Sequence, residues 1–158
     1  MADKGTERQL VVFDLAGEVY GVDINFVRGI IRMQAVTHVP NAPDFVEGVI
    51  NLRGRVIPIL DLRKRFGLRV SEETRDSRVV VVDIAGQNIG IIVDAVIEVL
   101  RLAADAIEPA SSLITTEDSY YLEGIAKLDG KLLILLDLDR VLSTDEQKAL
   151  QQAQSKAA

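Results

Sequence analysis

The sequence predicts a mainly β protein made of two similar units of about five strands each, arranged as small barrels or a sandwich. Short apolar runs rich in Val, Ile and Leu recur along the chain, and Gly, Asp or Asn ends each run. The same order of runs and turns occurs twice, which indicates an internal repeat. The predicted helices are short and few, so a doubly wound α/β sheet is disfavoured.

Turn residues separate the predicted strands. Gly17 and Gly86 each lie between two apolar runs, at positions that suit tight hairpin turns. Two further hairpins are predicted over 49–60 and 125–136, with turns at Arg53–Gly54 and Asp129–Gly130. The strand-length runs themselves are 11–13, 79–82, 89–93 and 132–136.

Four short helices are predicted from their capping residues. Asp23 is placed to cap a helix over about 24–31, with Ile24, Val27, Ile30 and Ile31 on one face. Asp61 and Asp137 each precede a predicted helical turn, and Gly67 would end the first of them. Ser143 and Glu146 have the spacing of a capping box before a weakly amphipathic surface helix over 145–156.

The repeat defines the predicted organisation of the chain. The stretch 11–17 matches 80–86 at a spacing of 69 residues, and 45–54 matches 121–130 at a spacing of 76. We therefore expect a first barrel over about 10–69, a polar linker over 70–77, a second barrel over about 78–142, and a C-terminal helix and tail over 143–158. Matched positions that differ in charge, such as Arg53 and Asp129, indicate that the two copies face different neighbours.

The composition excludes several classes of chemistry. The 158 residues include no Cys and no Trp, and His38 is the single histidine. Disulfides, thiolate metal sites and a cysteine nucleophile are therefore excluded, and we expect no enzyme activity, metal or cofactor. A net charge of -6 argues against nucleic-acid binding. No run approaches the roughly 20 apolar residues of a membrane span, and the polar start lacks a signal sequence, so we expect a cytoplasmic protein that does not insert into membranes.

Three segments resemble the CheW family, the adaptors of bacterial chemotaxis. The most distinctive is 45–63, which contains Asn51-Leu52-Arg53-Gly54, and the others are 20–24 and 90–94. The similarity defines a CheW-like domain over 9–142. It implies two SH3-like five-stranded barrels packed on a shared apolar seam. It also implies a non-enzymatic coupler that joins the histidine kinase CheA to the cytoplasmic tip of methyl-accepting receptors.

The resemblance also implies two sets of binding residues. A groove between the barrels would receive the helical receptor tip, since apolar side chains accept a helix stripe and an arginine fixes its register. The matching receptor-binding positions are Val27, Ile30, Gly48, Asn51, Arg53 and Gly54. The expected contacts with the regulatory domain of CheA are loop and turn positions, namely Gly17, Gly86, Tyr120 and Tyr121.

Alternatives remain open at several of these positions. Asn51 is also a residue that caps turns with its own side chain, and Val27 and Ile30 have the spacing of core residues. The basic segment of Arg53, Arg55, Arg63, Lys64, Arg65 and Arg69 is either a solvated helix face or a contact for an acidic partner. At the level of function, the alternatives are a coupler of a pilus or second-messenger system, and a ligand-binding barrel that uses Asp61 and Asp137.

Overall fold

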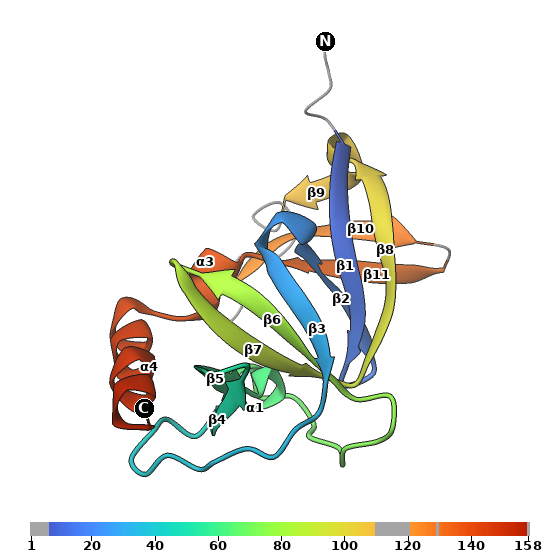
Figure 1. The fold of residues 1–158 in the computed structure, drawn as a ribbon. Helices are drawn as coiled ribbons and strands as arrows, with labels where there is room; N and C mark the ends of the chain where they lie inside the picture. The colour runs from blue at the N-terminus through green and yellow to red at the C-terminus, as the bar shows by residue number, and fades with distance from the viewer. Residues whose placement is uncertain (1–6, 110–120, 129, 158) are drawn as a thin grey trace.

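The computed structural model describes residues 7–109, 121–128 and 130–157, and it is mainly β, as the sequence predicts. Figure 1 shows the strands arranged as two curved sheets with a few short helices. Sheet A has the order β8-β1-β2-β11-β10-β9, and sheet B has the order β3-β6-β7-β5-β4. Sheet A has six strands instead of the expected five because the three-residue strand β9 adds to its edge.

The strands of sheet A are β1 (Glu7–Leu15), β2 (Glu18–Asp23), β8 (Ala95–Ala103), β9 (Ile107–Pro109), β10 (Leu122–Leu128) and β11 (Lys131–Leu136). Those of sheet B are β3 (Val27–Arg32), β4 (Val46–Leu52), β5 (Arg55–Leu60), β6 (Arg78–Ile84) and β7 (Gln87–Val93). The helical segments are η2 (Ile24–Phe26), α1 (Leu62–Phe66), η3 (Ala104–Ala106), α3 (Leu138–Val141) and α4 (Thr144–Ala157).

The two copies of the repeat exchange strands. The first hairpin of each copy, β1–β2 or β6–β7, joins the sheet that holds the remaining strands of the other copy. Equivalent parallel pairs close the exchange: Tyr20 of β2 lies opposite Ile134, and Gly90 of β7 lies opposite Ile59. The expected ranges 10–69 and 78–142 therefore do not coincide with the sheets. The correction has a physical cause, since matching strands of the two copies offer the same pattern of backbone and apolar groups for pairing.

The predicted hairpin turns are present with the backbone that a tight turn requires. Gly17, Gly54 and Gly86 each have φ of 83°. The residue before each, Ala16, Arg53 or Ala85, also has a positive φ, of 53° or 54°. Two successive positive φ values are typical of the type I′ turns that match the twist of paired strands.

The prediction of a helix over 24–31 is wrong. Asp23 does cap a helical turn, since its carboxylate accepts the N–H of Asn25 at 2.9 Å. That turn is only the 3₁₀ segment η2, and the chain continues as strand β3, which pairs antiparallel with β6. β-Branched residues and Gly29 favour the strand over a helix, and pairing with β6 outweighs the helical spacing of the apolar residues.

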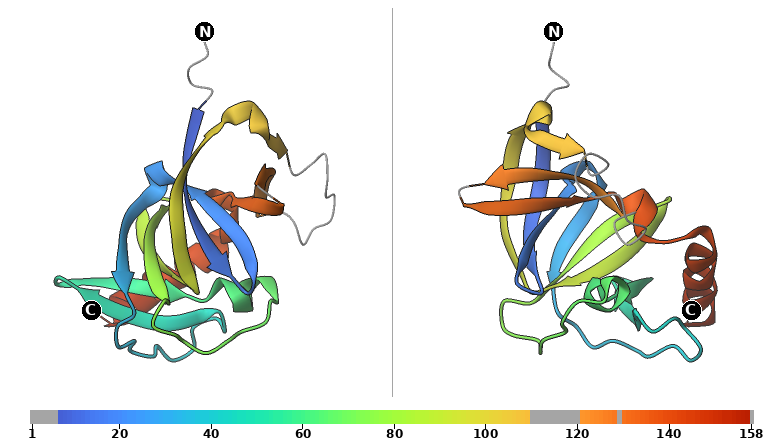
Figure 2. Two further views of the ribbon diagram at one scale, coloured as in Figure 1. Left: turned by 90° about the vertical axis from the view of Figure 1, so that its right-hand side faces the viewer. Right: turned by 180° about the vertical axis from the view of Figure 1, so that it is seen from behind.

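The other helices begin where their caps predict. The carboxylates of Asp61 and Asp137 accept backbone N–H groups two residues later, and Gly67 ends α1 in the left-handed conformation. Ser143 and Glu146 form the reciprocal capping box of α4, with bonds of 2.8 and 3.1 Å. In Figure 2, α4 lies beside sheet B, where it packs against β5.

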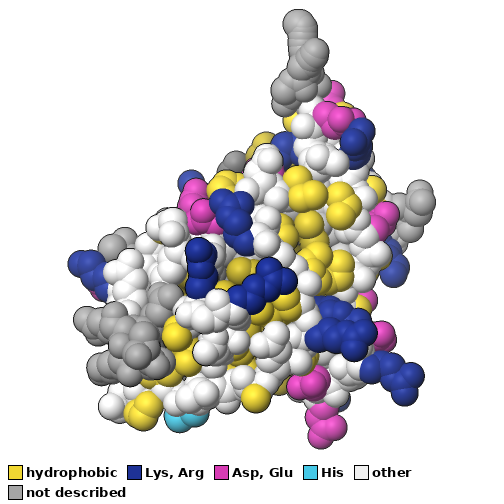
Figure 3. Space-filling view, in the orientation of Figure 1, with side chains coloured by type: hydrophobic (Ala, Val, Ile, Leu, Met, Phe, Trp, Pro, Cys, Tyr) yellow, Lys and Arg dark blue, Asp and Glu magenta, His cyan; other side chains and the backbone are white. Residues whose placement is uncertain are grey.

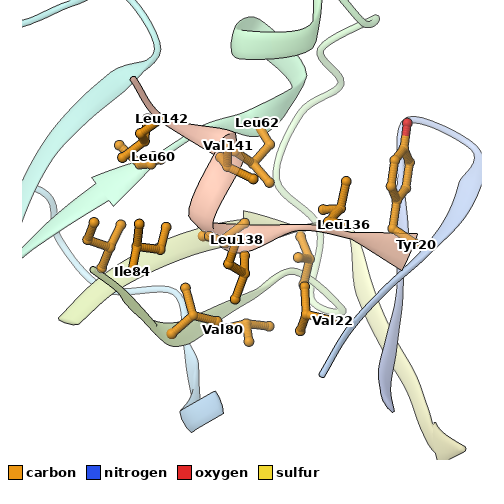
Figure 4. Packing of buried hydrophobic residues seen from close by; sticks show 14 of the residues in the cluster. Tyr20, Val22, Leu60, Leu62, Val80, Ile84, Leu136, Leu138, Val141 and Leu142 are labelled. Atoms are coloured by element: carbon orange, nitrogen blue, oxygen red, sulfur yellow. The ribbon is translucent and has the colours of Figure 1, made fainter. Parts of the chain in front are cut away.

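One face of each sheet packs against a central core that both sheets share, and the other face packs against an apolar cluster of its own. Because side chains alternate along a strand, Leu10 and Val12 face the cluster of sheet A while Val11 faces the central core. Ile50 and Ile59 belong to the corresponding cluster of sheet B. Figure 4 shows side chains of the central core arriving from both sheets and from α3. Its labelled members are Tyr20, Val22, Leu60, Leu62, Val80, Ile84, Leu136, Leu138, Val141 and Leu142.

Candidate binding surface

The β4–β5 turn holds three of the expected receptor-binding residues. The side-chain oxygen of Asn51 accepts the N–H of Gly54 at 2.9 Å, so this side chain is engaged in capping the turn. The β6–β7 turn has the same bond, from the N–H of Gly86 to Asp83 at 2.8 Å. Arg53 is exposed between the two capping partners. The turn is therefore a rigid support that presents the Arg53 side chain to solvent.

Val27 and Ile30 lie on strand β3 and not on a helix. Ile30 is 43% exposed, whereas Val27 is half-buried against the central core. In the cross-strand register, Ile30 lies opposite Val80, a buried residue of the central core. Ile30 therefore extends the apolar surface of the central core to the exposed edge of sheet B.

Gly48 has a structural explanation. Its φ is 147°, and a Cβ atom there would lie 2.1 Å from the carbonyl oxygen of Thr37. That oxygen accepts the N–H of Val49 at 2.9 Å, which ties the segment after β3 to strand β4. Gly124, at the equivalent position of the second copy, approaches the carbonyl of Glu108 in the same way. Gly48 thus permits close backbone approach at the edge of sheet B.

The expected receptor-binding residues fall into two groups. Val27 and Ile30 lie on β3, at one end of the strand order of sheet B. Gly48, Asn51, Arg53 and Gly54 lie on β4 or its turn, at the other end of that order. Figure 1 shows β3 running down the front of the molecule and the β4–β5 hairpin below it.

The expected kinase-binding residues lie at separate places. Gly86 lines a hollow of about 430 Å³ together with Arg55 and with Gln151 of α4. It is therefore close to the Arg53 turn. Gly17 lies in the β1–β2 turn, where the neighbouring N–H of Ala16 binds Asp94 at 2.8 Å. Tyr120 lies outside the described residues.

Tyr121 is part of an aromatic stack. Its ring lies 3.8 Å from that of Phe66 in α1, with the planes 7° apart. Tyr20 stacks on the same Phe66 at 6.4 Å and on Phe13 at 6.3 Å. Burial raises the pKa of Tyr20 to about 12. The stack ties strands of sheet A to helix α1, which follows strand β5 of sheet B.

The basic segment divides into buried and exposed residues. Arg63 is 6% exposed and forms a fork with both carboxylate oxygens of Asp61, at 2.9 and 3.0 Å. A third bond of 2.9 Å joins Arg63 to Asp94, the residue that also accepts the N–H of Ala16. Hydrogen bonding to Asp61 raises the pKa of Arg63, against the opposing effect of burial. For Arg63, the interpretation as a solvated helix face is therefore wrong.

Asp94 ends the segment 90–94 but was not predicted to be a site residue. It lies at the junction between β7 and β8, and through Arg63 and Ala16 it joins α1 to the β1–β2 turn. Its position after a buried apolar run was the available signal. The neighbours of Arg63 in the segment are paired as well, Lys64 with Glu47 at 2.7 Å and Arg65 with Glu146 at 3.2 Å. Hydrogen bonding to Glu47 raises the pKa of Lys64.

The two carboxylates considered for a ligand-binding barrel are helix caps. Asp61 accepts the N–H of Arg63 at 3.0 Å, and Asp137 accepts that of Asp139 at 3.0 Å. A hollow of about 510 Å³ lies elsewhere, beside β4, and includes His38 and Asn51 in its lining. In the described part of the chain, no helix has the length and hydropathy needed to cross a membrane.

Comparison with known proteins places the chain in a family. Residues 9–146 match the model of the CheW-like domain. The chain is 37% identical over 146 residues to the chemotaxis protein CheW of Klebsiella aerogenes, covering 92% of this chain and 88% of that protein. It is 34% identical over 154 residues to the chemotaxis protein CheW of Treponema pallidum, covering 95% and 91%.

A solved structure agrees with these relatives. The scaffolding protein TtCheW from Thermoanaerobacter tengcongensis superposes with a TM-score of 0.80 at 43% identity, over 88% of this chain and 94% of that one. Sequence and fold therefore lead to one assignment: the chain belongs to the CheW family of chemotaxis scaffolding proteins, which couple receptors to the kinase CheA and are not enzymes.

Proposed function

We propose that this chain binds the cytoplasmic tip of methyl-accepting receptors and the regulatory domain of CheA at the same time, as a cytoplasmic component of receptor arrays. The observation that carries the proposal is the pair of sheets that share one topology, one central core and exchanged strands. Such a core holds the turns and strand faces that would contact each partner in a fixed relation, and holding two partners at once raises the effective concentration of each for the other.

The receptor surface in this proposal combines Ile30 with the Arg53 turn. Ile30 offers an exposed apolar side chain on β3, as a helix stripe requires. Arg53 offers a guanidinium group that can form paired hydrogen bonds with a carboxylate or carbonyl oxygen. Val27, Gly48, Asn51 and Gly54 support these two side chains through packing, backbone approach and turn capping.

The kinase surface in this proposal includes the turns at Gly17 and Gly86 and the segment around Tyr120 and Tyr121. Both turns are short and exposed, so they can enter an interface without rearrangement of the sheets. The β6–β7 turn also lies beside α4, which widens the available surface at that end of sheet B.

The proposal is tested by measuring binding of the full chain to a receptor signalling tip and, separately, to the regulatory domain of CheA. The variant Arg53→Asp reverses the charge with the residue that the second copy carries at the matching turn position. Aspartate tolerates a positive φ, so the turn should form. We expect receptor affinity to fall about tenfold while the melting temperature changes by less than about 2 °C.

Lys127→Glu is the matched control, because it makes the same change of charge near the equivalent turn of the second copy. It should leave receptor affinity within about twofold. The proposal is refuted if the native chain binds neither partner at about 100 μM, since even a millimolar contact corresponds to about 4 kcal/mol. Equal losses of receptor affinity in the two variants would show that Arg53 is not part of the receptor surface.

A further inference from the structure

Two arginines lie directly opposite each other at one end of sheet B. In the antiparallel pairing of β3 with β6, Arg32 is in register with Arg78. Residues that face each other in this way point to the same side of the sheet, and like charges there destabilise the pair. The repulsion between Arg32 and Arg78 is a cost that the strand pairing itself does not require, so the reason for the pair is to be sought outside the sheet.

The repeat supplies an internal control for this pair. At the equivalent register of the second copy, Arg101 of β8 lies opposite Gln9 of β1. The positions correspond at the spacing of 69 residues that relates the two copies, with Arg32 matching Arg101 and Gln9 matching Arg78. A single arginine is therefore compatible with the strand pairing, and the second cation is a property of sheet B alone.

The charge of this pair is not neutralised within the described residues. Arg32 is exposed and forms no ion pair with another described residue, and the same holds for Arg75 nearby. Arg78 donates through Nη1 to the carbonyl oxygens of Arg75 and Ser77, both at 2.8 Å. These bonds fix the direction of the guanidinium group without cancelling its charge.

The three arginines line one hollow of about 440 Å³, which also includes Met33, Glu73 and Asp76. Neither acidic side chain forms an ion pair with an arginine there. In Figure 3, dark blue and magenta side chains gather at the lower right, below the end of β3 and over the loop that leads into β6. Hydrophobic side chains lie above them on the same face.

The hollow continues the exposed face of β3. Ile30 and Arg32 are two residues apart, so they point to the same side of the strand, and both are exposed. An apolar side chain is thus followed along one strand by an unpaired cation, with a second cation beside it. A partner segment that covers Ile30 and carries carboxylates next to its apolar residue fits this order of groups.

We propose that Arg32 and Arg78, assisted by Arg75, bind the carboxylates of an acidic segment of a protein partner that docks over Ile30. The inference rests on the proposed function, because Ile30 belongs to the proposed receptor surface. The arginine pair selects partners by charge: an acidic segment relieves the repulsion between Arg32 and Arg78, whereas a basic segment adds to it.

The test compares two charge reversals at equivalent positions, Arg32→Glu and Arg101→Glu. The full chain, labelled with ¹⁵N, is titrated with a hexaglutamate peptide while the Nε–Hε signals of the arginines are followed by NMR. We expect saturable shifts at Arg32 and Arg78 that weaken as NaCl rises. Arg32→Glu should weaken peptide binding at least tenfold, and Arg101→Glu should leave it within about twofold.

A second measurement separates binding from a structural role. Arg32→Glu replaces a like-charge pair by an opposite-charge pair, so the melting temperature should rise by about 1–3 °C. Arg101→Glu faces a neutral Gln9 and should produce no such rise. A variant that is more stable and yet binds the peptide less well cannot have lost binding through misfolding. A fall in melting temperature for Arg32→Glu would show that the pair is structural and would overturn the proposal.

Two further outcomes also overturn it. If the peptide shifts neither the Arg32 nor the Arg78 signal, these arginines do not form the proposed binding site. Shifts of the same signals by inorganic phosphate at a lower concentration than by the peptide would indicate a site for small oxyanions in place of a docking surface. The peptide titration does not use a receptor tip, so failure of the native chain to bind the tip would refute the proposed function while leaving this result readable.

Discussion

The central core has two halves that occupy equivalent positions of the repeat but differ in chemistry. One half is an aromatic stack of Phe13, Tyr20, Phe66 and Tyr121. The matching positions in the other half hold Val82, Ile89, Leu142 and Phe45, all of them buried. Position is thus kept between the copies, but burial is not, since Phe66 and Tyr121 are only partly buried whereas Leu142 and Phe45 are buried. The aromatic rings of one half are replaced by mostly aliphatic side chains in the other.

The difference in side-chain type between the two halves corresponds to the helix that each half packs against. The aromatic half packs against α1, whose Phe66 lies between Tyr20 and Tyr121. The aliphatic half leads into α4, which places Leu150 in the same core. The ring of Phe45 lies 5.5 Å from the guanidinium group of Arg65, which in turn pairs with Glu146 of α4. A repeated unit therefore keeps its fold while each copy adapts its surroundings.

The largest difference in stability between equivalent substitutions in the two copies is expected at the two helix caps. Asp61 pairs with Arg63, and their side chains are 3% and 7% exposed. In the second copy Asp139 stands at the position of Arg63, and Asp137 pairs with Arg140, with side chains 28% and 54% exposed. Asp61→Ala leaves a buried cation without its main partner and should cost about 3–5 kcal/mol in the free energy of unfolding. Asp137→Ala removes an exposed cap and should cost about 1 kcal/mol.

Urea denaturation of both variants measures this difference. Similar costs for the two variants would mean that Asp94 alone holds Arg63 and that the fork to Asp61 adds little.

A smaller difference is expected at high pH, where Tyr20 titrates and its counterpart Ile89 does not. Burial raises the pKa of Tyr20 from 10.0 to about 12. The unfolded chain then loses this proton near pH 10 and the folded chain near pH 12, so the stabilising effect is complete below pH 10 and is lost between these values. The loss should be about 2–3 kcal/mol at 1.36 kcal/mol for each pKa unit.

Absorbance of the phenolate near 295 nm follows the ionisation, and urea unfolding between pH 9 and pH 12 follows the stability. Tyr20→Phe should remove both the late ionisation step and most of this loss. An unchanged pH profile in that variant would assign the loss to other groups.

The smallest difference is expected between two equivalent glycines in β2 and β7. A Cβ atom at Gly90 would lie 2.5 Å from the Cδ1 atom of Ile59 and 2.7 Å from Cγ1 of Val79. At Gly21 the nearest atom would be Cδ1 of Leu133, at 3.3 Å. Gly90→Ala should therefore destabilise the protein by about 1–3 kcal/mol and Gly21→Ala by less than about 1 kcal/mol.

Thermal unfolding of the two alanine variants compares them directly. If Gly21→Ala were the more destabilising, the closer contacts around Gly90 in sheet B would not determine the cost of adding a methyl group.

Local features of the fold could be predicted from the sequence because short-range interactions decide them. The turn at Arg53–Gly54, the caps at Asp61 and Asp137, and the capping box at Ser143 each depend on groups within four residues. The repeat could also be recognised, because it compares residue types and needs no knowledge of contacts. The turn that presents Arg53 belongs to this predictable part.

Other features depend on distant contacts and were missed or misassigned. The segment 24–31 has helical spacing, yet most of it forms β3 because β6 supplies hydrogen-bonding partners more than 45 residues away in the sequence. Arg63 was assigned to a basic surface, yet it is buried, where Asp94 from the β7–β8 junction adds to its pairing with the nearby Asp61. Neither distant partner, β6 for the segment or Asp94 for Arg63, can be inferred from the neighbouring residues in the chain.

The sequence by itself determined the hairpins with their turns, the helix caps, the repeat and the family. Only the tertiary structure decided which strands share a sheet, since hairpins of either copy present the same pattern for pairing. The tertiary structure also decided which charges remain without a partner. Arg63 is neutralised by the local Asp61 and by Asp94 from a distant part of the chain, whereas Arg32 faces Arg78. The physical reason is that burial and charge pairing depend on contacts between distant segments, whereas turns and caps depend on contacts within one.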